Sequence, residues 1–295
     1  MRLFLATNTT NVSLEAIKQV KPKNLLFSYY YLKGKDKAFI EDIFGFCLNN
    51  GIKIFLDSGA FSFMLNKDQD HSMNFFRGFA QEYITFIQEY YKYIFCYAEL
   101  DVDLVIGYMN VLYLRKLFPK EILGKMLPVF HPETRTFNDW KKDCSEFEYL
   151  ALGSTGDVTS AKSFSYYAKF LGHSHKNGNR VHGFALINQL VLKTFPFYSA
   201  DSSSWTSGNI YGNFPIFDIK KGKITSGKYN NFTDIAKYIP YLLQNCPNFL
   251  KLYNQNNAPK SIMHVSRLII GASAYMELEK YLTKLWTAKG VTWNI

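Results

Sequence analysis

The sequence predicts an α/β protein, a (β/α)8 TIM-like barrel with a C-terminal helical extension. Two observations predict this fold. Short apolar runs alternate with longer segments of helical periodicity, and one run together with its helix takes up roughly 30 residues or fewer, as in such barrels. The runs are continuously apolar, which is typical of parallel strands buried on both faces. A doubly wound sheet is the competing fold, but no GxGxxG motif follows the first run and no GxxxxGK[ST] motif occurs.

Eight runs of apolar, β-branched or aromatic residues are the predicted strands. Most are separated by a segment with the 3.6-residue apolar spacing of an amphipathic helix. The strands are expected at residues 3–7, 24–29, 53–57, 93–100, 125–131, 149–153, 181–186 and 197–201. Helices between them are expected, among others, at residues 36–49, 75–92, 158–175 and 188–193.

The alternating pattern ends near residue 215. A Gly- and Lys-containing segment, residues 220–228, is expected to be a loop. Helical periodicity then returns near residues 233–243 and 259–289. We therefore expect residues 1–215 to form the barrel catalytic domain and residues 216–295 to form a helical extension packed on it.

Composition excludes several classes of protein. The chain has 295 residues, of which 47% are hydrophobic and 20% charged, so it is not disordered, collagen-like or disulfide-stapled. Its four cysteines (Cys47, Cys96, Cys144 and Cys246) lie far apart without a CxxC pair, which indicates reduced thiols and a cytoplasmic location. No apolar segment reaches the roughly 18 residues that span a bilayer, so no membrane association is expected.

The charge balance favours a polyanionic partner. Lys and Arg number 34 against 24 Asp and Glu, a formal net charge of +10. Basic side chains of this kind neutralise phosphates in nucleic acids. Drift in an A·T-rich genome also explains the Lys excess and the 17% of aromatic residues, so the charge alone does not distinguish the two origins.

Polar residues gather where the predicted strands end. In a barrel, the carboxyl ends of the strands and the loops that follow them carry the active site. The candidates are Asp57-Ser58-Gly59 after the third strand, Glu99, Asp101 and Asp103 after the fourth, His131 after the fifth, Gly153-Ser154 after the sixth, His182 on the seventh, and Asp201 with Trp205 after the eighth.

Two of these carboxylates, Asp57 and Asp201, are expected to face one barrel mouth. Paired carboxylates can divide the work at a sugar, since one attacks the anomeric carbon while the other moves the proton. A metal hydrolase is not favoured, because no HxH follows the first strand and the His173/His175 pair ends a predicted helix. No GxSxG elbow for a serine nucleophile occurs. We expect neither a metal nor a cofactor.

From Lys53 to Trp205 the chain resembles the tRNA-guanine transglycosylase superfamily, and in particular its phage and mobile-element relatives that insert 7-deazaguanine into DNA. Asp57-Ser58-Gly59-Ala60-Phe61 resembles the Asp-Ser-Gly-Gly-(Phe/Tyr) segment of the family, and residues 181–185 resemble its Leu-Met-Gly-Val-Gly segment. Leu152-Gly153-Ser154 is similar to its Gly-Gly turn.

The resemblance implies a role for each matched residue. Asp201 would be the nucleophile and Asp57 the general acid and base. The remaining matches would bind substrate: Phe61 and His182 by stacking on the base, Asp101 (or Glu99) by reading its edge, His131 in place of a base-contacting Gln, Ser58, Gly153 and Ser154 beside the base, and Trp205 by stacking on neighbouring bases.

The implied activity is that of a pentosyltransferase. It would exchange guanine for a 7-deazaguanine base, a queuosine-like modification, through a covalent glycosyl-aspartate. The family's CxCxxC zinc site is missing, with Cys246 and His264 the only candidates in that region. DNA is therefore favoured over tRNA as the partner, besides the free base, and a homodimer or a partner protein is a further candidate partner. The relatives place the protein in a bacterial cell, where it would be phage-encoded.

Two alternatives remain open. One is an N-glycoside hydrolase that uses the same Asp57/Asp201 pair on a free nucleoside or nucleotide. The other is a non-catalytic barrel that binds nucleic acid, in which the two carboxylates serve only turns and caps. If the polymer is the substrate, the basic residues should border the barrel mouth rather than the opposite end.

Overall fold

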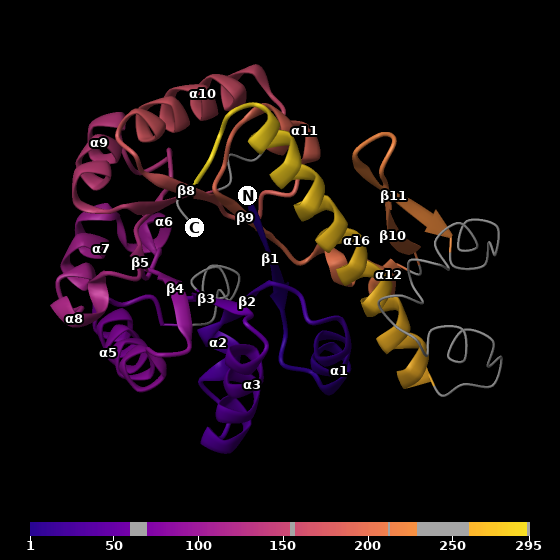
Figure 1. Ribbon diagram of the computed structural model, residues 1–295. Helices are drawn as coiled ribbons and strands as arrows, with labels where there is room; N and C mark the ends of the chain where they lie inside the picture. The colour runs from indigo at the N-terminus through magenta and orange to yellow at the C-terminus, as the bar shows by residue number, and fades with distance from the viewer. Residues whose placement is uncertain (60–69, 154–156, 212, 229–259, 294–295) are drawn as a thin grey trace.

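The computed structural model describes residues 1–59, 70–153, 157–211, 213–228 and 260–293. Within these residues, parallel strands form one sheet in the order β5-β4-β3-β2-β1-β9-β8-β7-β6. β5 and β6 stand at the two ends of this order, yet they are neighbours in the chain, separated only by Pro128. The sheet therefore closes on itself, and the predicted TIM-like (β/α)8 barrel with a C-terminal helix is confirmed (Figure 1).

All eight predicted strands are present, and the fifth is split in two. Pro128 has no N–H to donate to a neighbouring strand, so the ladder is interrupted there. The strands of the barrel are β1 (Arg2–Thr7), β2 (Asn24–Ser28), β3 (Lys53–Asp57), β4 (Ile94–Ala98), β5 (Met126–Leu127), β6 (Val129–Phe130), β7 (Tyr149–Leu152), β8 (Arg180–Gly183) and β9 (Ser199–Ser202).

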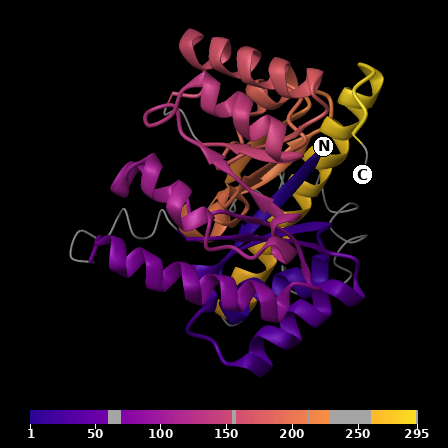
Figure 2. The same cartoon turned by 90° about the vertical axis from the view of Figure 1, so that its left-hand side faces the viewer.

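Helices form a ring around these strands (Figures 1 and 2). Six of them begin at a residue whose side chain accepts a backbone N–H of the first turn, namely Thr10, Asp36, Ser72, Thr136, Ser160 and Asn188. The ring consists of α1 (Asn11–Val20), α2 (Tyr29–Leu32), α3 (Lys37–Asn49), α5 (Met73–Tyr90), α6 (Asp103–Ile106), α7 (Tyr108–Arg115), α8 (Lys120–Leu123), α9 (Phe137–Glu146), α10 (Ala161–Lys176) and α11 (Gln189–Thr194).

The C-terminal helix α16 (Lys260–Ala288) completes this ring between α11 and α1 (Figure 1). Its Trp286 Nε1 donates to the carbonyl oxygen of Leu192 in α11 at 3.0 Å. Its Glu279 accepts the backbone N–H of Leu3 and the amide of Asn24, so it joins the starts of β1 and β2. The helix predicted over residues 259–289 therefore packs on the barrel, as the helix that covers its last and first strands.

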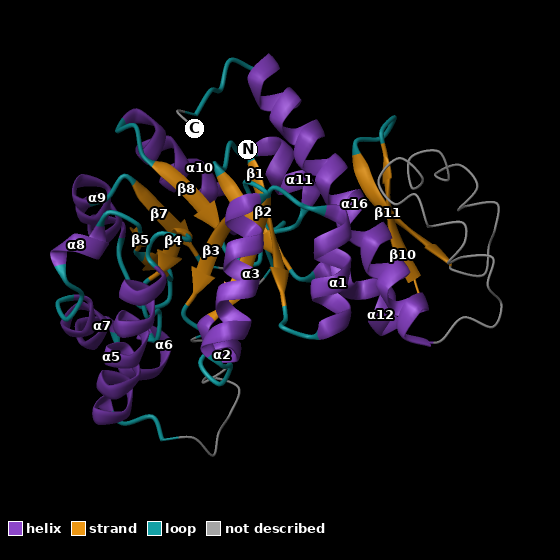
Figure 3. Ribbon diagram, turned by 60° about the horizontal axis from the view of Figure 1, so that its bottom comes forward, coloured by secondary structure: helices purple, strands orange, loops and turns teal. Residues whose placement is uncertain are grey.

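One prediction for the C-terminal part is wrong. Residues 220–228 are not a loop, because β10 (Asn213–Asp218) and β11 (Lys223–Lys228) form an antiparallel hairpin. It follows the 3-10 turn Ser204–Thr206 and α12 (Ser207–Tyr211), and it lies outside α16 (Figure 3). The rings of Phe217 and Tyr281 pack 5.7 Å apart, so the hairpin is in contact with α16. The border expected between residues 215 and 216 runs through β10, and the helix expected near residues 233–243 lies outside the described residues.

The aromatic residues fill two layers of core. Inside the barrel, Phe4, Phe55, Tyr149 and Tyr198 pack with smaller aliphatic side chains. Between strands and helices, two larger apolar clusters take in most of the remaining buried residues, including those of α16. Of the cysteines, Cys47, Cys96 and Cys144 are buried and unpaired. In the part of the chain that the structure describes, no helix is long and apolar enough to cross a membrane.

Candidate active site

A cavity of about 630 Å³ opens at the carboxyl ends of the strands. Four carboxylates of the described residues line it, from Asp57 at the end of β3, Asp101 after β4, Glu133 after β6 and Asp201 on β9. The other described lining residues include His131, Gly153, Phe184 and apolar side chains from β1 and β2. The barrel therefore brings together the acidic and histidine side chains that the sequence placed at separate strand ends.

Asp57 is held by a tight turn. Its Oδ2 accepts the backbone N–H of Gly59 at 3.1 Å. Gly59 has a φ of +83°, and a β-carbon there would lie 2.4 Å from the β-carbon of Tyr30, so only glycine fits. Burial and the nearby charge of Asp201 raise the pKa of Asp57 to about 6, against the hydrogen bond from Gly59. A carboxyl group with this pKa can both lose and take up a proton near neutral pH.

Asp101 lies beside Asp57 in the cavity. Burial, followed by the charge of Asp57, raises the pKa of Asp101 to about 8. The Ser58 hydroxyl, which is fully buried, donates to Asp101 Oδ1 at 2.8 Å. Ser58 is thus placed behind the carboxyl group, and it positions Asp101 rather than lining the cavity.

His131 is oriented by Asp103, a strand-end carboxylate to which the sequence assigned no role. Asp103 Oδ1 lies 2.7 Å from His131 Nδ1, and the Thr134 hydroxyl donates to the other oxygen of Asp103. Burial lowers the pKa of His131, but the hydrogen bond with Asp103 and the charges of Asp103 and Asp101 outweigh it, so the net shift is upward. Because Nδ1 faces Asp103, Nε2 is the ring nitrogen left for a ligand.

Gly153 allows this histidine ring to lie against the backbone of β7. A β-carbon at position 153 would lie 2.2 Å from His131 Cδ2 and 2.6 Å from Nε2. In the predicted small-residue turn, Gly153 is therefore required by the packing of the His131 ring. Ser154, its neighbour, lies outside the described residues, as does Phe61.

Asp201 receives its hydrogen bonds on one oxygen. The backbone N–H of Ala185 donates to Oδ1 at 2.7 Å, and His182 Nε2 lies 3.2 Å from the same atom. Ala185 adopts a left-handed φ of +48°, a strained conformation for a residue with a β-carbon, which turns its N–H onto the carboxylate. Among the described residues no hydrogen bond engages Oδ2, so this oxygen remains available in the cavity.

Two predicted ligand residues lie elsewhere. His182 is fully buried inside the barrel, where its ring packs 4.8 Å from Phe55 and 4.7 Å from Phe184, so it has no face open for stacking on a base. Trp205 is also fully buried, and its Nε1 donates to the carbonyl oxygen of Ala6. Phe184, two residues after His182, lines the cavity instead.

Phe184 and Ala185 were missed as site residues, and Asp103 was a candidate without a predicted role. Asp103 had a signal, since it belongs to the acidic run after β4, but nothing in the sequence pairs it with His131. Phe184 and His182 both belong to residues 181–185, which resemble one segment of the family. They differ in how deep they lie in the barrel, and the sequence does not show this depth. Glu99, the alternative to Asp101, faces away from the cavity and pairs with Arg115.

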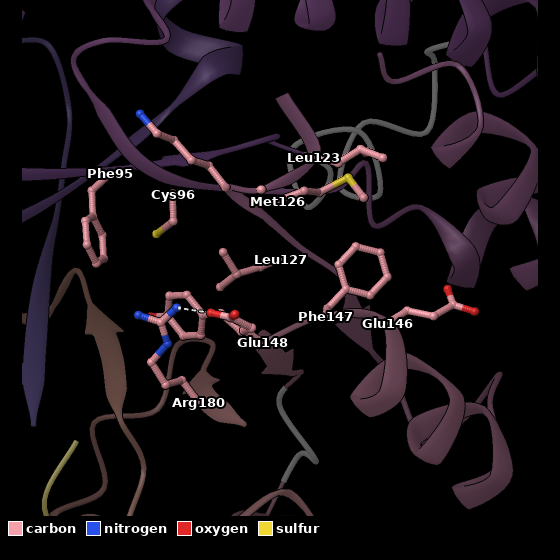
Figure 4. Close-up of a pocket in the computed structure, with 12 residues that line it drawn as sticks. Phe95, Cys96, Leu123, Met126, Leu127, Glu146, Phe147, Glu148 and Arg180 are labelled. Atoms are coloured by element: carbon pink, nitrogen blue, oxygen red, sulfur yellow. Dashed lines mark hydrogen bonds and ion pairs between the residues drawn. The ribbon is translucent and has the colours of Figure 1, made fainter. Parts of the chain in front are cut away.

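Basic residues gather at the opposite end of the barrel, where the strands begin. Arg2, Lys53 and Arg180 are the first residues of β1, β3 and β8. Lys125 and Arg180 line a pocket of about 280 Å³ at this end, and Arg180 pairs there with Glu148 (Figure 4). The described lining of the mouth cavity contains neither Lys nor Arg, so the expected basic border is not found in that part of the chain.

In the ranges that the structure describes, no three His, Cys, Asp or Glu side chains gather as a metal site requires.

Comparison with known proteins leaves the activity open. No protein-family model matches the chain, and no curated protein is similar to it. Among solved structures, the chain is similar to an HpcH/HpaI aldolase from Desulfitobacterium hafniense DCB-2, with a TM-score of 0.43 and 9% identity over 71% of this chain and 89% of that chain. A likeness at this level carries no information about the reaction.

Proposed function

We propose that the protein is a glycosyltransferase that exchanges a guanine base through a covalent glycosyl-aspartate on Asp201. One observation carries the proposal: two carboxylates in one cavity have different environments. Asp201 Oδ1 accepts the Ala185 N–H and lies 3.2 Å from His182 Nε2, whereas burial and the charge of Asp201 raise the pKa of Asp57 to about 6. Such a division is typical of a nucleophile and a general acid acting on one glycosidic bond.

The proposed reaction has two displacements. Asp201 Oδ2 attacks C1′ of the nucleotide, the electron pair of the C1′–N9 bond passes to guanine, and protonated Asp57 supplies the proton that the leaving base needs. Asp57, now a carboxylate, removes the N9 proton of the incoming 7-deazaguanine. This base attacks C1′ and releases Asp201. Two inversions retain the configuration at C1′.

The base-binding groups follow from the same cavity. Asp101 can accept the N–H donors on the edge of guanine, while His131 Nε2, when protonated, can donate to the carbonyl oxygen. Gly153 leaves room for the ring of His131, and Phe184 provides an aromatic wall for stacking. The proposed contacts keep Asp101 and His131 in the roles expected from sequence and replace His182 by Phe184.

The nucleotide donor is proposed to be nucleic acid, with DNA favoured over tRNA. The family resemblance supports this choice, whereas the basic residues at the strand starts lie at the end of the barrel opposite the cavity. A base in a duplex must be flipped into the cavity, at a cost of a few kcal/mol.

Trapping the intermediate tests the proposal directly. Protein is incubated with a guanine-containing oligonucleotide, and the expected result is a mass adduct on the peptide that contains Asp201. Asp201→Asn should abolish the adduct, and Asp57→Ala should slow its formation. An active Asp201→Asn variant would falsify the nucleophile assignment, and unchanged exchange in Asp57→Ala would exclude proton transfer by Asp57.

A hydrolase for free nucleosides or nucleotides is the second candidate. The observation that favours it is the acidic lining of the mouth, without Lys or Arg among its described residues. The two candidates differ in salt dependence, because binding to a polyanion weakens steeply as salt rises whereas binding of a nucleoside does not. Base release from guanosine together with no affinity for oligonucleotide at low salt would select the hydrolase. Salt-sensitive binding without turnover, unchanged in an Asp57/Asp201 double variant, would instead indicate a binding protein.

A further inference from the structure

A row of polar side chains runs through the interior of the barrel and ends at Asp201. The Tyr149 hydroxyl contacts the Ser199 hydroxyl, Ser199 Oγ lies 2.6 Å from His182 Nδ1, and His182 Nε2 lies 3.2 Å from Asp201 Oδ1. Ser199 and His182 are completely buried, and Tyr149 and Asp201 are each 7% exposed. Burying four hydrogen-bonding groups in an apolar barrel is costly unless each finds its partner.

Strand register builds the row. His182 on β8 is paired with Ala151 of β7 on one side and with Ser199 of β9 on the other. Because side chains alternate along a strand, Ser199 and Asp201 point to the same face, the barrel interior. The imidazole is fixed laterally by aromatic edges, with the rings of Phe55 and Phe184 within 5 Å.

With Asp201 as the acceptor and His182 as a neutral ring, the protons of this row have one order. His182 then donates from Nε2 and accepts at Nδ1. Ser199 supplies that proton and in turn accepts from Tyr149. Burial raises the pKa of Tyr149 well above its usual value, so the phenol keeps its proton and remains the first donor.

We propose that Tyr149, Ser199 and His182 are positioning residues for Asp201. By fixing His182 in its Nε2–H tautomer, they hold Asp201 Oδ1 together with the Ala185 N–H and leave Oδ2 directed to the substrate. This inference rests on the proposed function of Asp201 as the nucleophile. It assigns His182 a role in the reaction without contact to the base.

The Nδ1–H tautomer of His182 would have the opposite effect on Asp201. If Ser199 did not donate to Nδ1, His182 could carry its proton there and turn a lone pair toward Asp201. The carboxylate would lose a donor and gain a repulsive neighbour, which favours the protonated, non-nucleophilic form.

The test compares Ser199→Ala and Tyr149→Phe with Tyr198→Phe. Tyr198 is a matched control because it is also buried and its ring packs edge to face with that of Tyr149, but its hydroxyl accepts from Arg2 and takes no part in the row. Nitrogen-15 NMR of histidine-labelled protein reports the tautomer without substrate, and the His182 signals are identified by their loss in His182→Gln.

Adduct formation on Asp201 across a pH series gives the second measurement. Asp57, Asp101, His131 and Glu133 line the same cavity, and they are unchanged in all three variants. We expect Ser199→Ala to slow adduct formation about ten- to hundredfold, the effect of one lost hydrogen bond to a charged group, and to move the rising limb of its pH profile upward by about one unit. Tyr149→Phe should act in the same direction but less, and Tyr198→Phe should not move the profile.

The outcomes separate the two proposals. An Nδ1–H tautomer or an imidazolium at His182 in the native protein would overturn the positioning role, as would equal pH profiles in Ser199→Ala and Tyr198→Phe. Absence of any adduct in the native protein, with His182 in the Nε2–H form, would overturn the proposed function while confirming the ordered row. His182→Gln, which keeps a side-chain donor, should retain more activity than His182→Leu.

Discussion

The barrel contains two groups of carboxylates with opposite surroundings. At the seam between β4 and β6, Glu99 and Asp143 are paired with Arg115 and Arg135. At the mouth, Asp57, Asp101 and Asp201 line one cavity, and among the described residues none of them pairs with Lys or Arg. The seam carboxylates meet positive charge, whereas the mouth carboxylates chiefly meet one another.

The seam has a structural reason. Pro128 interrupts the strand, and Glu99 Oε1 accepts the backbone N–H of Val129 at 2.7 Å while Arg135 donates to the Val129 carbonyl oxygen. Side chains thus replace ladder hydrogen bonds at the point where the barrel closes. Unpaired carboxylates at the mouth serve no such purpose, since their mutual repulsion destabilises the fold. Groups held at this cost are candidates for chemistry.

The largest effect is expected at Asp201. Asp201→Asn should lower base exchange by roughly a thousandfold or more, because a nucleophile is lost. Its thermal stability should not fall, since one of three neighbouring carboxylates is removed. Activity on a guanine-containing oligonucleotide and the melting temperature are measured together. If the activity and the melting temperature both fell, Asp201 would have a structural role like that of the seam carboxylates.

Arg115→Met tests the seam, where a loss of stability is expected. Arg115 donates to both oxygens of Glu99 and to Asp143, so the variant leaves buried charge without its partner. The free energy of unfolding should fall by about 3 to 5 kcal/mol. Denaturant unfolding measures it. Arg180→Met is the control, because its ion pair with Glu148 is exposed and should contribute about 1 kcal/mol or less. Equal losses would contradict the comparison.

Asp101→Asn should change how stability depends on pH. The folded pKa of Asp101, about 8, lies above its value in the unfolded chain, so the folded state binds more protons and stability is lost as pH rises from about 4 to 8. The variant should be more stable than the native protein at pH 8, by about 1.4 kcal/mol or more.

Asp103→Asn provides the opposite sign. Burial raises the pKa of Asp103. The hydrogen bond with His131 and the charge of His131 lower this pKa by more than burial raises it, so the net shift is downward. This carboxylate therefore stabilises the fold above its unfolded pKa, and the contribution is lost as pH falls. Unfolding curves at several pH values should diverge in opposite directions for the two variants. If the stability of both variants changed with pH in the same direction, the opposite pKa shifts assigned to Asp101 and Asp103 would be wrong.

The smallest effect is expected at Gly153. Gly153→Ala places a β-carbon against the His131 ring, which must move and loosen its contact with Asp103. The KM for the free base should rise about tenfold, equivalent to about 1.4 kcal/mol, while kcat changes less. Gly172→Ala in α10 is the control, because its β-carbon meets open space, and it should stabilise the helix by about 0.5 to 1 kcal/mol. Unaltered KM in Gly153→Ala would remove His131 from base binding.

Much of the fold was predictable because its signals are local. The helix beginning at Lys37 follows a capping Asp36, and the strand Lys53–Asp57 ends at a turn that Gly59 alone can form. The hairpin of β10 and β11 was not predicted, because the Gly and Lys residues of segment 220–228 were interpreted as a loop. Its contact with α16 joins segments that are distant in the sequence, and such contacts leave no local signal.

For the candidate site, the sequence by itself determined which residues stand at strand ends: Asp57, Asp101, His131, Gly153 and Asp201 all line the cavity. Only the tertiary structure decided their depth and their partners. His182 and Phe184 differ by two positions and point to the same face of β8, yet one is buried beneath Asp201 and the other lines the cavity. The stagger of neighbouring strands sets this depth, and it arises from closing the barrel, which no single segment of the sequence records.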